Sequence, residues 1–131
     1  MRRIALALGL ALTVALAPAP AVAHPVDIDA CLTRADVAIC DDTFSYLYGD
    51  TVILKGVVSP FHDEAVVQSK APGSDRWERA ATVSVSDTGK AKWRWRTRRS
   101  DAVQDAPYLL RFKIPGHGRS DTVEAWILFG E

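Results

Sequence analysis

Apolar residues recur at every second position along most of this chain, in short runs that are separated by turn residues. From Thr43 onward the runs end about every ten residues at glycine, proline or aspartate, as at Gly49-Asp50 and Pro72-Gly73. Successive side chains of a β-strand point to opposite faces, so this period is typical of half-buried strands. About seven such strands and no amphipathic helix, beyond a possible turn near Cys31, predict an all-β sandwich.

The N-terminus has the pattern of an export signal. Arg2 and Arg3 precede the apolar run Ile4–Ala17, and the small residues Ala21-Val22-Ala23 follow it. Fourteen apolar residues are too few for a transmembrane helix, which needs about 20. We therefore expect a signal peptide over residues 1–23, a secreted or extracytoplasmic protein, and no transmembrane segment in the mature chain.

Length and charge limit what the mature chain can be. Removal of 23 of the 131 residues leaves 108, which suffices for one domain. The signal holds two of the 16 basic residues and none of the 16 acidic ones, so the mature chain has 14 against 16, a net charge of −2. That balance disfavours a nucleic-acid-binding domain, which is typically basic overall.

Only two cysteines are present, Cys31 and Cys40. In an exported protein they are expected to form a disulfide, which would stabilise the fold by roughly 2–3 kcal/mol on the chain-entropy model. A metal site is the weaker alternative, because two thiols without a nearby histidine pair make a poor zinc ligand set. We expect a short disulfide-stapled segment over residues 24–42, followed by the sandwich over 43–131.

The segment KWRWRTRR, residues 92–99, alternates tryptophans with basic residues. On a strand, burying the two tryptophans removes about 150–250 Å² each from water, roughly 4–6 kcal/mol apiece. Burying the cations instead would cost several kcal/mol each. We therefore predict that Trp93 and Trp95 face the core and that a basic strip faces outward, comprising Lys92, Arg94, Arg96, Arg98 and Arg99.

The basic strip has two interpretations. It is a solvated face that keeps sheet edges from pairing, or a docking surface for an anionic partner such as a cell-wall polymer, lipid headgroups or an acidic exported protein. Nucleic acid is disfavoured, because tryptophans that face inward leave no aromatic platform on which bases could stack.

The stretch from Gly49 to Phe129 resembles bacterial secreted immunoglobulin-like domains. GDTVILKGVVSP is similar to their opening strand, VVQSK followed by WERAATVSVSDTGKAKWRW to their middle, and APYLLRF to their penultimate strand. The resemblance implies an immunoglobulin-like antiparallel sandwich of about seven strands. It also implies a tyrosine corner in which the Tyr108 hydroxyl caps the backbone of the preceding turn.

The sequence departs from that family's antibody-type members. Leu110 stands where their second inter-sheet cysteine would fall, and both cysteines lie upstream of the sandwich. Such domains act as spacers, adhesion modules or binding modules, so the resemblance implies a non-catalytic role without a cofactor. Their binding loops lie at the ends of the sandwich, which makes PGHGRSD a candidate recognition loop with His117 and Arg119 as its polar contacts; the alternative is a plain turn.

Three histidines are the remaining candidates for chemistry. His24 would be the mature N-terminal residue, and with His62 or His117 it could hold copper, which makes a small exported copper-binding sandwich the alternative function. Ser120 near His117 and Asp121 suggests a hydrolase, but residues so close along a glycine-rich turn cannot form a triad. Asp63 and Glu64 point to opposite faces of a strand and do not make a carboxylate pair.

Overall fold

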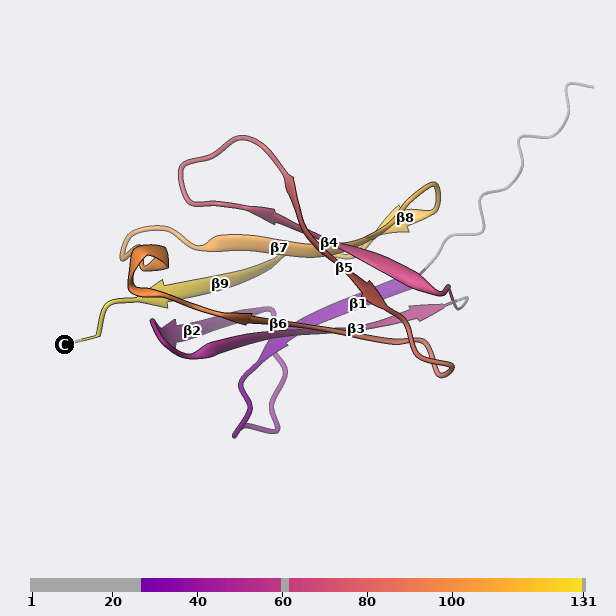
Figure 1. Cartoon of the computed structure of the whole chain (residues 1–131), viewed down its shortest axis with the longest axis horizontal. Coiled ribbons are helices and arrows are strands. Elements are labelled where there is room, and N and C mark those ends of the chain that lie inside the picture. Colours follow the sequence, from indigo (N-terminus) through magenta and orange to yellow (C-terminus); the bar gives the residue numbers. More distant parts are fainter. Residues whose placement is uncertain (1–26, 60–61, 131) are drawn as a thin grey trace, which may run out of the picture.

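The structure is a computed structural model that describes residues 27–59 and 62–130. Residues 1–23, predicted as a signal peptide, lie outside this range. Nine strands and one short 3-10 helix make up the fold (Figure 1). They are β1 (Asp27–Thr33), β2 (Thr43–Leu47), β3 (Thr51–Ser59), β4 (Glu64–Lys70), β5 (Glu78–Ser84), β6 (Lys90–Arg96), η1 (Arg99–Asp101), β7 (Tyr108–Ile114), β8 (Gly118–Arg119) and β9 (Val123–Leu128).

The strands form two sheets, which confirms the predicted β-sandwich. One sheet has the order β1-β3-β6, and the other has the order β2-β9-β7-β4-β5 with β8 paired to β7. Figure 1 shows β3 and β6 in one layer and β4 and β7 in the other. All pairings are antiparallel except that of β2 with β9, which is parallel.

Two of the nine strands were missed in the sequence. Strand β8 has only two residues, too few for a period to be visible. Strand β1 alternates Asp27 and Asp29 with Ile28 and Leu32, and aspartate is depleted in strands. Strand β1, which lies within the 24–42 segment, pairs along its whole length with β3 and so is part of a sheet of the sandwich.

The core lies between the sheets and is built from alternate residues. Strand β3 contributes Val52, Leu54 and Val58, all fully buried, and β7 contributes Leu110 and Phe112 from the opposite sheet. Leu110 is thus a fully buried hydrocarbon side chain of this core.

Two tyrosines anchor backbone at the borders of the core. The Tyr108 hydroxyl donates to the Asp101 carbonyl oxygen at 2.7 Å, which confirms the predicted cap on the preceding turn. The buried Tyr46 hydroxyl donates to the Thr33 carbonyl oxygen, also at 2.7 Å. Burial raises the pKa of both phenols above its usual value, so each hydroxyl stays a proton donor.

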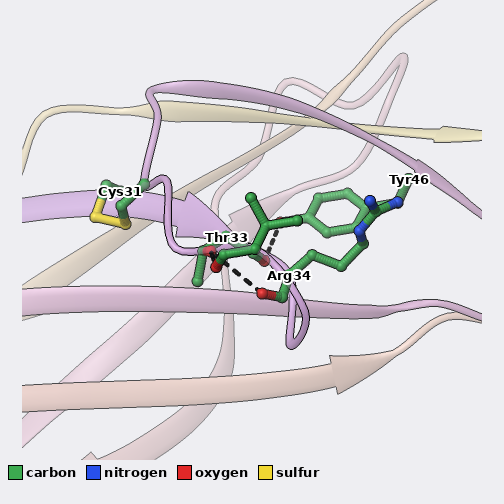
Figure 2. Close-up of a disulfide and its surroundings, with 6 residues drawn as sticks. Cys31, Thr33, Arg34 and Tyr46 are labelled. Atoms are coloured by element: carbon green, nitrogen blue, oxygen red, sulfur yellow. Dashed lines mark hydrogen bonds between the residues drawn. A yellow bond between two sulfur atoms is a disulfide. The ribbon is translucent and has the colours of Figure 1, made fainter.

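The predicted disulfide joins Cys31 and Cys40, whose Cα atoms are 5.3 Å apart (Figure 2). It closes the loop that leaves β1. At the base of this loop the Leu32 amide donates to the Asp41 carbonyl at 2.7 Å, and the Asp41 amide donates back at 2.8 Å. Within the loop, the Thr33 hydroxyl donates to the Val37 carbonyl at 3.0 Å. The staple thus connects β1 to the segment that leads into β2.

Gly56 of β3 lies close to Phe112 of the opposite sheet and to the backbone of the neighbouring strand β1. A Cβ atom placed there would lie 2.6 Å from a ring carbon of Phe112 and 2.6 Å from the Asp29 carbonyl oxygen. Real Cβ atoms essentially never come so close to other heavy atoms. Only glycine therefore leaves room for the Phe112 ring against the middle of β3.

Gly56→Ala should destabilise the protein by about 1–3 kcal/mol, because the added methyl group must displace either the Phe112 ring or the β1 backbone. Denaturant unfolding measures the change. Ser59→Ala, at an exposed position of the same strand, is the control and should stay within about 0.5 kcal/mol of wild type. Equal stabilities of the two variants would contradict the close approach.

Candidate functional site

Strand β6 has the orientation that its sequence predicts. Trp93 and Trp95 pack against the core and are half-buried, with ring centroids 6.0 Å apart, and Trp95 meets the edge of Tyr108 at 4.9 Å. Lys92, Arg94 and Arg96 are exposed on the other face. The tryptophans are not fully covered because β6 is an edge strand, and a hollow of about 280 Å³ lies beside their rings.

Sheet pairing adds two lysines to these cations. Lys55 of β3 lies directly opposite Lys92, and Lys90 precedes Lys92 by two residues on β6. Cross-strand partners share a face of the sheet, so five exposed cations gather on the outer face of β3 and β6. We call this set the basic face: Lys55, Lys90, Lys92, Arg94 and Arg96.

Within the described residues, no carboxylate lies within ion-pair distance of a cation of the basic face. The ion pairs found in this part of the chain are Arg34 with Asp36 and Arg98 with Asp101. Like charges directly opposite each other destabilise a sheet, and Lys55 with Lys92 is such a pair. Cations on an edge strand can be explained as protection against edge pairing. That explanation fails for Lys55, because β3 is the central strand of its sheet.

A groove of about 500 Å³ runs beside the lysines on this outer face. Its walls include Lys55, Lys90 and Lys92, the disulfide of Cys31 and Cys40, and Asp29 of β1. The stapled loop therefore borders the basic face, a relation that spacing in the sequence did not reveal. Three of the five cations thus line a concave surface.

The last two residues of the predicted basic strip lie apart from the first three. Thr97 is buried where β6 ends, and its hydroxyl donates to the Asp50 carbonyl at 2.8 Å. Beyond it, Arg98 pairs with Asp101, with 3.9 Å between Nε and Oδ2, and Arg99 begins η1. The basic face thus ends at Arg96.

The candidate recognition loop, residues 115–121, follows β7 and contains the two residues of β8. His117 is exposed, and its ring centroid lies 4.6 Å from that of His62 at the start of β4. Arg119 is exposed opposite Lys113. The structure therefore places His62 and His117, two of the three histidines considered for copper, next to each other. The third, His24, lies outside the described residues.

Ser120 has a structural role. Its buried hydroxyl accepts a hydrogen bond from the Phe112 amide at 2.9 Å and donates to the Asp121 carbonyl at 3.0 Å. A hydroxyl engaged on both sides by backbone is not arranged as a nucleophile with an adjacent base. Over residues 27–59 and 62–130, no group of three or more histidines, cysteines or carboxylates is arranged to hold a metal ion.

A second cationic feature, on the other sheet, was missed in the sequence. Arg111 of β7 is buried, its Nε donates to Oε1 of Gln68 at 2.7 Å, and its guanidinium lies 3.8 Å from the centroid of the Trp77 ring. Burial, and to a lesser extent the charge of Arg119, lowers the pKa of Arg111. Nothing in the sequence indicated that Trp77, which lies in the β4–β5 loop, covers Arg111.

Fold and surface together define a disulfide-stapled β-sandwich whose basic face makes no ion pair within the described residues. No known protein family matches the sequence, and a search of curated proteins finds no match. Among the described residues, no helix is long and apolar enough to cross a membrane.

Neutralising Lys55 should stabilise the fold. Lys55→Gln removes the repulsion with Lys92, and Lys55→Glu replaces it with an attraction. The free energy of unfolding should therefore increase from the wild type to Lys55→Gln to Lys55→Glu, by about 0.2–1 kcal/mol in total. Thermal unfolding at low salt measures the order, and 1 M salt should shrink the differences by screening. If the wild type were the most stable of the three proteins, the result would contradict repulsion between Lys55 and Lys92.

Proposed function

We propose that this protein is an exported, non-catalytic binding module that holds an extended anionic polymer on its basic face. The observation that carries the proposal is the set of five exposed cations without a carboxylate partner in the described part of the chain. An anionic ligand would relieve the repulsion between Lys55 and Lys92 and gain charge-assisted hydrogen bonds.

The spacing of the cations favours a linear ligand. Residues two apart on a strand are separated by about 6.7 Å, so the row from Lys90 to Arg96 extends for about 20 Å along β6. A polymer with regularly spaced anions can bridge such a row at several points. Individual contacts at exposed positions are weak, each about 0–1 kcal/mol, so affinity would depend on several contacts at once.

Two features favour a cell-wall polymer over other anions. The export signal and the disulfide suit a bacterial protein outside the cytoplasm, where anionic wall polymers are found. Nucleic acid is disfavoured, because Trp93 and Trp95 lie on the face of β6 opposite the cations and the basic face therefore offers no stacking platform. Acidic lipid headgroups remain as the alternative that the test separates.

The test is co-sedimentation with purified cell wall that carries a polyglycerol phosphate polymer. At 0.1 M salt the wild type should sediment with the wall, and Lys92→Gln/Arg94→Gln should bind at least about tenfold more weakly. At 1 M salt, where the Debye length is about 3 Å, binding of the wild type should also fall. The matched control is Arg76→Gln/Arg79→Gln, which removes two exposed cations outside the basic face and should bind as the wild type does.

Several outcomes would contradict the proposal. They are no sedimentation of the wild type at low salt, equal losses in the two double variants, and binding to walls stripped of the polymer. Stronger binding to phosphatidylglycerol vesicles than to the wall would assign the basic face to a membrane surface instead.

A further inference from the structure

The His62–His117 pair lies away from the groove and carries an inference that is independent of polymer binding. The two side chains come from different connections, β3–β4 and β7–β8, and their rings lie 4.6 Å apart at a tilt of 45°. Only the fold brings them together, because 54 residues separate them along the chain.

The Nε2 atom of His62 is buried and has no hydrogen-bond partner in the described part of the chain. It is the only side-chain nitrogen or oxygen there of which this is true. A neutral imidazole has one donor and one acceptor nitrogen, and burying either without a partner costs free energy. A group that binds this nitrogen would remove the cost.

His117 is placed to share such a group. It is exposed in a tight turn whose amide donates to the Ile114 carbonyl at 2.9 Å. Gly116 and Gly118 flank it with backbone φ values of 79° and 150°, which residues other than glycine rarely adopt. The turn therefore holds the His117 backbone beside His62, with the His117 side chain exposed.

The ring separation suits a shared metal ion. Histidine nitrogen lies about 2.0–2.1 Å from a bound first-row metal, so two imidazoles on adjacent positions of one ion have centroids about 4.5–5 Å apart. Imidazole suits copper, nickel and zinc, and affinity among these is highest for Cu(II). Magnesium and calcium prefer oxygen ligands and would not bind here.

We infer that His62 and His117 form a transition-metal site that prefers Cu(II), with solvent in the remaining coordination positions. The site consists of these two imidazoles alone, since the described residues supply no third histidine, cysteine or carboxylate to it. Its metal binds at the end of the sandwich where β3 passes to β4.

The test is titration of the mature chain with CuSO4, followed by calorimetry and by electron paramagnetic resonance. One ion should bind per chain, with hyperfine coupling to two imidazole nitrogens. His117→Gln, an exposed change, and His62→Ala should each weaken binding by more than about tenfold. His24→Gln is the matched control, since His24 is the only other histidine, and it should retain the two-imidazole signal.

A second readout does not depend on how well the variants fold. CuSO4 should raise the melting temperature of the wild type, and NiCl2 and ZnCl2 should raise it less, because an ion bound only to the folded state stabilises that state. The same copper concentration should leave the His117→Gln melting temperature unchanged. Unaltered copper binding in both pair variants, or a signal that is lost only in His24→Gln, would overturn the assignment.

Discussion

The orientation of strand β6 is the constraint on which the rest of the surface depends. Its tryptophans must pack between the sheets. Burying their apolar area is favourable by several kcal/mol, whereas the opposite orientation would bury the alternating cations and cost several kcal/mol for each. Once Trp93 and Trp95 face inward, the basic side chains between them must face outward. Pairing with β3 then places Lys55 beside Lys92, and the result is a charged surface that the fold tolerates at some cost in stability.

The scaffold behind this surface is rigid for reasons that are local and specific. Gly56 lets the two sheets close over Phe112, and the hydroxyls of Tyr46 and Tyr108 tie loop backbone to the borders of the core. The disulfide holds the loop after β1 against the edge of the basic face. A multipoint ligand gains from such rigidity, because little conformational freedom is lost when it binds.

Sequence patterns predicted those features of the structure that depend on residues close together along the chain. Period-two alternation predicts the class of fold and the opposite orientations of Trp93 and Arg94. The two cysteines are nine residues apart in a chain with a predicted export signal, which indicates their disulfide. The position of Tyr108 indicated its hydrogen bond through a resemblance to immunoglobulin-like domains. In each case a short segment carries the information.

What the sequence did not reveal depends on pairing between distant segments. The register of β3 against β6 decides that Lys55 faces Lys92, and a shift of one residue would send Lys55 to the other face. Three other features also join segments far apart in sequence. They are the contact of His62 with His117, the packing of Trp77 on Arg111 and the parallel pairing of β2 with β9. None of these has a local signal, because each is set by how the whole sheet assembles.

The most direct test of the central claim is a nuclear magnetic resonance titration of the mature protein with soluble polyglycerol phosphate at low salt. If the basic face is the binding surface, resonances of the outward residues of β3 and β6, above all Lys55, Lys92 and Arg94, should shift with increasing polymer and return on addition of salt. Resonances near Arg111 on the opposite sheet should stay in place. Shifts confined to that sheet, or none in β3 and β6, would contradict the account.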